Sequence, residues 1–305
     1  MSATYPNAVP SFQSRIGRDA RSGFPAVAHR YRLHLTSSCP NSLRIAVTHS
    51  LLGLRDVLPV TMLPAVPDAS DGGYLALRPL YEASSHLHPG PALAPVLGDD
   101  WTGRIVSTHA PDIVQDLTRR FGASGPRLYP DGADARIEEV GRLCEEGLNA
   151  AAQRAGQYGA DPAARDVALA ALLRGLGVLE RRLASVDHLL GDHLTAADVQ
   201  VWVTLVQLDT VHRWHLDAAA VYRITDHPRL WSYARRLAAH PAFAQHLDLD
   251  GIALRHHAHC RGREAAGAAV RIVDWTRCTP STDTDSGTGP GPGPGPGKVV
   301  RTIGG

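Results

Sequence analysis

Lysine is almost absent from this chain of 305 residues, in which Lys298 is the only one and arginine supplies every other strongly basic side chain. The 31 basic residues are balanced by 30 acidic ones, so the formal net charge is +1 at pH 7. This balance gives no electrostatic reason to expect a nucleic acid or an acidic partner. The arginine- and alanine-rich composition is typical of a GC-rich bacterium.

Cysteine is also scarce, with Cys39, Cys144, Cys260 and Cys278 lying far apart. This spacing is not the disulfide framework of a secreted protein and favours a reducing compartment. The first residues contain no apolar run like that of a signal peptide, and no stretch is long enough to span a bilayer. We therefore expect a cytoplasmic protein with no membrane partner.

The chain divides into four stretches by composition and pattern. Residues 1–27 are irregular and interrupted by proline and glycine, and residues 278–305 carry a Gly-Pro repeat that predicts a disordered tail. Between them, residues 28–124 mix strand and helix patterns, whereas residues 125–277 are helical in pattern.

The region 28–124 predicts the order β-α-β-α-β-β-α, with strands at 30–35, 56–63, 92–98 and 103–107 and helices at 40–52, 74–84 and 109–121. Pro40 suits the first position of a helix, and Gly53 suits its end. This order is that of the thioredoxin-like fold. In that fold the proline before the third strand, here Pro95, has a cis peptide bond.

The clearest signal in the helical region is a helix start at Thr195. Thr195 and Asp198 have the spacing of a capping box, Leu194 can act as the hydrophobic staple, and an almost entirely apolar helix follows. We therefore interpret Thr195 and Asp198 as folding residues. Cys144 is interpreted as a packed helix residue.

Several segments together resemble one family of enzymes. They are GFPAVAHRYRLHLTSSCP, LLGLRDV, APVLGDDWTGRIVS, GDHLTAADVQVWVTLVQLDTVHRWH and ITDHPRLWSYARRL. They are similar to Xi-class glutathione transferases, also called glutathionyl-hydroquinone reductases, over residues 12–273. The resemblance implies an α/β thioredoxin-like N-terminal domain, an all-α C-terminal domain and a homodimer.

The resemblance also implies a cysteine nucleophile, Cys39. It would attack the sulfur of a glutathionyl-hydroquinone and form a mixed disulfide that a second thiol resolves. Pro95 would be cis, and the backbone of Ala94 would pair with the cysteinyl part of the thiol cofactor. Independently of the family, a cysteine at a helix start is favoured as thiolate, and Arg44 adds positive charge if it turns inward. The alternative is a buried structural cysteine.

The sequence departs from the family in the residues that hold glutathione. The family motif Cys-Pro-Trp-Ala-x-Arg is here Cys39-Pro40-Asn41-Ser42-Leu43-Arg44. A Glu-Ser pair that holds the γ-glutamyl group in the family is replaced by His109 and Ala110. Losing these charged hydrogen bonds would cost roughly 2–4 kcal/mol of affinity for glutathione.

Two accounts fit this loss. Either the cofactor site has decayed, or the enzyme uses mycothiol, which has no γ-glutamyl group. We favour mycothiol, because the composition suits bacteria that make it. A glutathione transferase-like conjugating enzyme and a non-catalytic binding protein remain alternatives.

The substrate side lacks the tyrosines that the family has near Gln153 and in residues 256–258. Nearby candidates for binding the aromatic substrate are Tyr158, His212, His215 and His257. The tract HHAHC at residues 256–260 looks like a metal site, but three histidines within four residues need ligands from elsewhere to surround zinc. We therefore expect no metal.

Overall fold

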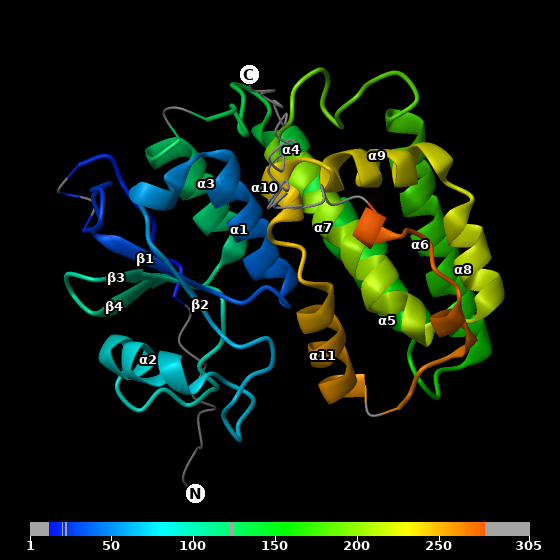
Figure 1. The fold of residues 1–305 in the computed structure, drawn as a ribbon, viewed down its shortest axis with the longest axis horizontal. Helices are drawn as coiled ribbons and strands as arrows, with labels where there is room; N and C mark the ends of the chain where they lie inside the picture. The colour runs from blue at the N-terminus through cyan, green and yellow to red at the C-terminus, as the bar shows by residue number, and fades with distance from the viewer. Residues whose placement is uncertain (1–11, 20, 22, 123–124, 261, 278–305) are drawn as a thin grey trace, which may run out of the picture.

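A computed structural model describes residues 12–19, 21, 23–122, 125–260 and 262–277. It has a small sheet with flanking helices, followed along the chain by a larger all-helical half (Figure 1). The predicted tail at 278–305 and Cys278 lie outside the described residues. Among the residues described, no helix has the length and apolar composition needed to cross a membrane.

The first half contains the elements β1 (Tyr31–Leu35), α1 (Pro40–Leu51), β2 (Val60–Met62), α2 (Arg78–Ser84), β3 (Val96–Asp99), β4 (Arg104–Ser107) and α3 (Ala110–Arg120). The strand order is β2-β1-β3-β4. β2 is parallel to β1, whereas β3 and β4 are antiparallel to their neighbours. This topology confirms the predicted thioredoxin-like fold.

Two predicted strands are shorter than expected. β2 begins only at Val60, because Gly53 adopts φ 64° and starts a 3-10 turn at Leu54–Asp56. β3 begins only after Pro95, whose missing N–H cannot join the sheet ladder. The predicted helix 74–84 is divided into a 3-10 turn, Leu75–Leu77, and α2.

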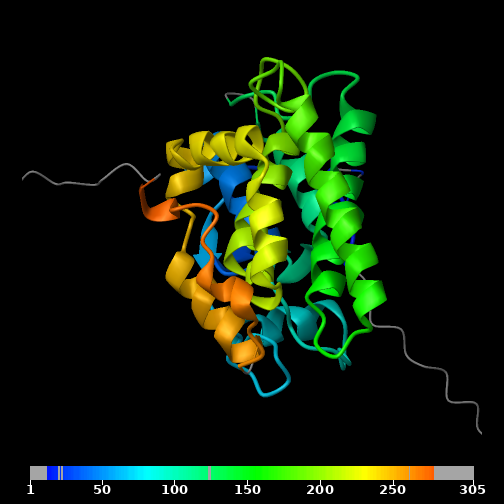
Figure 2. The same ribbon diagram turned by 90° about the vertical axis from the view of Figure 1, so that its right-hand side faces the viewer.

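The second half contains α4 (Asp134–Arg142), a π-helical stretch (Leu143–Asn149), α5 (Ala150–Ala155), α6 (Pro162–Arg182), α7 (Ala196–Thr210), a 3-10 turn (His212–His215), α8 (Ala218–Thr225), α9 (Pro228–Ala238), α10 (Pro241–Ala244) and α11 (Leu249–Cys260). Figure 2 brings these helices to the front. Short 3-10 turns at Ala266–Ala269 and Trp275–Arg277 follow.

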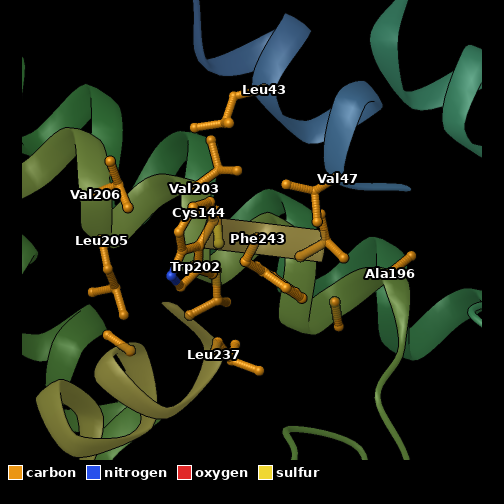
Figure 3. Close-up of a cluster of buried hydrophobic side chains, with 14 of the residues drawn as sticks. Leu43, Val47, Cys144, Ala196, Trp202, Val203, Leu205, Val206, Leu237 and Phe243 are labelled. Carbon is orange, nitrogen blue, oxygen red and sulfur yellow. The ribbon is translucent and has the colours of Figure 1, made fainter. Parts of the chain in front are cut away.

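Helix α7 is the centre of the core. Trp202 in this helix is fully buried and meets Phe243 edge-on, with ring centroids 5.0 Å apart. Leu43 and Val47 of α1 approach α7 beside Val203, so the apolar core continues from one half into the other (Figure 3). Cys144 is packed in this core, as predicted, and burial raises its pKa to about 12.

The capping box at the start of α7 is present as predicted. Asp198 does more than cap the helix, because its Oδ1 accepts hydrogen bonds from Leu189 N at 2.9 Å and from the Tyr233 hydroxyl at 2.8 Å. Both side chains, Asp198 and Tyr233, are buried. One carboxylate therefore joins the loop before α7 to α9.

The other end of α7 holds the last described segment of the chain. Asp209 is buried and accepts hydrogen bonds from Trp275 Nε1 at 2.8 Å and from the backbone of Val273 at 3.2 Å. Arg213 Nε lies 2.9 Å from Asp209 Oδ1. These bonds fix residues 272–275 against the core.

The segment before β1 is irregular, as predicted, but its described part is packed against the sheet. Gln13 forms a bridge with Ser107 of β4, and Ile16 is buried in the core. Arg15 Nη2 lies 2.7 Å from Asp116 Oδ1 in α3. The start of α3 is therefore covered by this segment.

Candidate active site

Cys39 occupies the N-cap position of α1, with Pro40 at the first helical position. Its backbone is extended (φ −101°, ψ 127°), and its carbonyl accepts the first helical hydrogen bond from Leu43 N at 2.8 Å. The Cys39 side chain forms no capping hydrogen bond and is partly exposed. The thiol is therefore reachable, at the end of the helix where the dipole favours an anion.

The sheet register brings the predicted cofactor residues to the end of the sheet at which β1 stops and Cys39 follows. In the β1–β3 pair, His34 lies opposite Val96, so the preceding Ala94–Pro95 peptide lies beside the end of β1. That peptide is cis, as predicted. Leu97 pairs with Ser107, so the chain leaves β4 toward His109 and Ala110 at this same end of the sheet.

His109 and Ala110 form the start of α3. His109 is the N-cap residue, its backbone N–H donates to Ser107 Oγ at 3.1 Å, and Ala110 is buried. His109 Nδ1 lies 3.0 Å from Asp112 Oδ2. Asp112 Oδ1 in turn accepts a hydrogen bond from Arg15 Nη1 at 3.1 Å. The first turn thus contains a carboxylate, which sequence reasoning missed, but both of its oxygens have partners.

Arg44 turns toward the helical half rather than only toward the thiol. Its guanidinium donates to Asn41 Oδ1 at 3.2 Å and also to Gln200 Oε1. Gln200 Nε2 donates to Glu145 Oε1 at 3.2 Å. Burial lowers the pKa of Arg44, and attraction by Glu145 opposes this shift; attraction by Cys39 acts in the same sense as Glu145. A polar strip therefore runs from Asn41 to Glu145 along one side of the site.

A cavity of about 440 Å³ lies beside the start of α1. Its walls include Ser38 and Pro40 from the first half and a basic set from the second half, namely His212, His215, Arg255, His256, His259 and Arg263. A narrow apolar crevice lined by Cys39, Leu43 and Val206 shares Ser38, Pro40, Gln207, Val211 and Ile252 with this cavity. The thiol therefore lies next to a space large enough for an aromatic ligand.

Three of the four predicted substrate residues line this cavity. Tyr158 is at the rim and 81% exposed, His215 is at the wall, and His212 is buried with no partner for its Nε2 atom. Burial, with a smaller contribution from His215 and His256, lowers the pKa of His212 to about 4.

His257 is not among the residues that line the cavity. It is exposed, and its Nδ1 donates to Ala253 O at 2.8 Å. Successive residues of a helix point about 100° apart, so one face of α11 takes His256, His259 and Cys260 to the cavity and turns His257 away.

Helix α11 forms one wall of the cavity and is bonded to the first half. Arg255 Nη1 donates to the Tyr74 hydroxyl at 3.0 Å, and Ser37 Oγ donates to Asp248 Oδ2 at 2.5 Å. In Figure 1, α11 accordingly lies between the sheet half and helices α5 and α7. Asp248 also caps the helix by accepting from Gly251 N at 2.8 Å, and this Asp-x-x-Gly spacing was the available sequence signal.

Comparison with known proteins agrees with this arrangement. A family model, the C-terminal domain of glutathione S-transferases, matches residues 134–236. The glutathionyl-hydroquinone reductase PcpF of Sphingobium chlorophenolicum is 29% identical over 78% of this chain and 80% of its own. The corresponding reductase YqjG of Escherichia coli is 27% identical over 79% of this chain and 78% of its own.

Solved structures give the same result. The Xi glutathione S-transferase of Phanerochaete chrysosporium superposes with a TM-score of 0.72 at 26% identity, covering 84% of this chain and 94% of that one. Glutathione-bound YqjG gives 0.72 at 26% identity, covering 82% and 89%. The fold is that of a glutathione transferase. Within that superfamily, the chain is similar to enzymes of the Xi class, the glutathionyl-hydroquinone reductases.

Proposed function

We propose that the protein is a cysteine-dependent reductase that removes a low-molecular-weight thiol from a hydroquinone or a similar aromatic. The observation that carries this proposal is the position of Cys39. It lies at the start of α1, between the end of the sheet that carries cis-Pro95 and the cavity lined by His212. YqjG and PcpF, whose names specify glutathionyl-hydroquinone reduction, support the same reaction.

In the first step the Cys39 thiolate attacks the sulfur of the thioether adduct. A sulfur–sulfur bond forms and the sulfur–carbon bond breaks, while the electron pair stays on the aromatic carbon, which takes a proton. A second thiol, as thiolate, then attacks the mixed disulfide and releases Cys39 as thiolate. The net reaction converts the adduct and one free thiol into the free hydroquinone and a disulfide, one sulfur of which comes from the adduct.

Intact-mass measurement tests this step. Incubation with an adduct, without a second thiol, is expected to add the mass of one thiol to the wild-type protein and to Cys144→Ser. Cys39→Ser is expected to gain no mass and to lose turnover. A Cys39→Ser variant that keeps its turnover would contradict the proposal.

We further propose that the preferred thiol is mycothiol rather than glutathione. The support is His109 and Ala110 at the start of α3, together with Asp112, whose two oxygens are bonded to His109 and Arg15. An ammonium group would find no free carboxylate there, whereas the hydroxyls and amide of mycothiol do not need one. Against this, YqjG was solved with glutathione bound. The ratio of kcat/KM for the two adducts decides between them.

We also propose that the protein is a cytoplasmic homodimer with two domains. The family resemblance supports a homodimer, and the dispersed cysteines support a cytoplasmic location. We place the boundary between the two domains at residues 124 and 125, because the sheet and α3 end before it and α4 follows. Light scattering is expected to give twice the chain mass, and a monomer at working concentrations would contradict the dimer.

A further inference from the structure

Three side chains from two separate elements meet in the wall of the 440 Å³ cavity. They are His215, from the 3-10 turn after α7, and His256 and Cys260, from α11. The ligand atoms of all three lie within 4.8 Å of one another, and the two histidine Nε2 atoms are 2.9 Å apart. His256 and Cys260 are one helical turn apart, so their side chains lie on one face of α11.

The backbone orients the ring of His215 for binding a cation. Its Nδ1 lies 3.2 Å from the carbonyl oxygen of Arg263, which can only accept a hydrogen bond. Nδ1 therefore carries the ring proton, and Nε2 presents a lone pair toward His256. A histidine that ligates a metal is usually held in this way, by donating its other N–H to a carbonyl or carboxylate.

The spacing is close to that of a zinc site. A tetrahedral zinc with bonds of ~2.1 Å to nitrogen and ~2.3 Å to sulfur holds its ligand atoms roughly 3.3–3.6 Å apart. The two nitrogens need to separate by roughly half an ångström from 2.9 Å, and the sulfur needs to approach by at most about 1.2 Å from the 4.8 Å limit. Side-chain rotation alone supplies shifts of this size.

We propose that His215, His256 and Cys260 form a site for a divalent cation that prefers nitrogen and sulfur ligands, with zinc as the type case. Binding releases the thiol proton of Cys260 and moves the proton of His256 from Nε2 to Nδ1. Three protein ligands leave a fourth position. Because all three residues line the cavity, that position faces the space beside Ser38 and Pro40, where water or an anionic ligand atom completes the shell.

A second group, His256, His257 and Glu264, also has its ligand atoms close together. It shares His256 but has no thiol, and His257 and Glu264 lie 4.0 Å apart with His257 exposed. Zinc and cobalt prefer the set that includes sulfur. The two sets therefore differ in their spectra and in the variants that abolish them.

The test uses the full chain without a histidine tag, stripped with a chelator and titrated with Co²⁺ and Zn²⁺. We expect one metal ion per chain and a thiolate-to-cobalt charge-transfer band in the near ultraviolet. Cys260→Ser is expected to lose the band, and His215→Ala to weaken zinc binding at least ~10-fold. Cys39→Ser and Cys278→Ser are the thiol controls, and His257→Ala is the control on the same helix.

Retention of the band and the affinity in these three controls supports the site. The proposal is overturned if stripped wild-type protein takes up no metal, or if cobalt binds without the charge-transfer band. It is also overturned if His257→Ala abolishes binding while His215→Ala does not. The wild-type cobalt spectrum reports thiolate ligation by itself, so the result does not depend on whether every variant folds.

Discussion

The hydroxyl of Ser37 donates to Asp248 Oδ2 at 2.5 Å and so ties the loop that carries Cys39 to the first turn of α11. The two residues are 211 positions apart in the chain. Loss of this bond in Ser37→Ala is expected to lower the free energy of unfolding by about 1–2 kcal/mol. We also expect the KM for the thiol adduct to rise several-fold, because the cavity wall is no longer fixed against the thiol loop.

Ser50→Ala is the matched control for this variant. Ser50 Oγ is hydrogen-bonded to His246 Nε2 at 2.7 Å and also joins the two halves, but at the other end of α1. A similar loss of stability is expected, measured by urea unfolding, with KM and kcat unchanged. Equal kinetic effects in both variants would show that the Ser37 bond acts only through stability.

Exchange of the residues at the start of α3 is expected to change the preferred thiol. His109→Glu combined with Ala110→Ser restores the acceptor and hydroxyl that a γ-glutamyl group needs. The ratio of kcat/KM, glutathione adduct over mycothiol adduct, is expected to rise at least ~10-fold.

Ala110→Ser alone is the control for this exchange, because Ala110 is buried and the added hydroxyl costs stability. It is expected to lower the melting temperature and to change the ratio less than the double variant does, because the acceptor for the ammonium group is still missing. A wild-type protein that prefers the glutathione adduct would refute the mycothiol proposal. Turnover of neither adduct would favour a binding protein with a decayed site.

Stability is expected to depend on residues 272–275, which Asp209 holds, and not on residues 281–305. Trp275→Ala removes a buried indole and one hydrogen bond to Asp209, so a loss of roughly 3–5 kcal/mol is expected. Deletion of residues 281–305 is expected to leave the melting temperature and turnover unchanged, as the Gly-Pro composition predicts.

Trp101→Ala is the matched control, because Trp101 is 66% exposed. It is expected to cost less than ~1 kcal/mol. A clear fall in melting temperature after the 281–305 deletion would show that the tail docks on the fold.

Histidine burial predicts a loss of stability in mild acid. Burial, with a smaller contribution from His49, lowers the pKa of His246 from its ordinary 6.5 to about 4. The unfolded chain therefore binds a proton that the folded chain excludes, and stability falls as the pH drops from about 6.5 toward about 4. At pH 5 the share of His246 is about 2 kcal/mol.

Urea unfolding at pH 7.5 and pH 5.0 measures this difference. His246→Gln is expected to reduce it by that share, whereas substitution of the exposed His193 is the control. An unchanged difference in His246→Gln would mean that His246 is protonated in the folded protein.

The parts of the fold that were predictable depend on short local signals. A strand, Cys39, Pro40 and an amphipathic stretch fix the start of α1, and the Thr195–Asp198 spacing fixes the start of α7. Pro95 marks the beginning of β3, although the predicted strand extended across it. Each of these signals acts within a few residues, through capping groups or a missing N–H.

The site was less predictable because its contacts join distant segments. His215 and His256 are 41 positions apart, and nothing in either segment alone indicates that they meet. We expected no metal because we examined only the tract at residues 256–260, and the sequence does not indicate that His215 lies beside it. His257 was predicted among the substrate residues, whereas His256 lines the cavity, because the face of α11 that lines the cavity depends on how that helix docks.

A substitution in the segment before β1 can change which thiol the protein accepts. Arg15 and His109 share the carboxylate of Asp112, so a substitution at Arg15 would release one of its oxygens. Helix α3, which we propose contacts the thiol cofactor, would then gain acidic character without any change in its own sequence. Homologues that differ only ahead of the first strand are therefore expected to diverge in the thiol they accept.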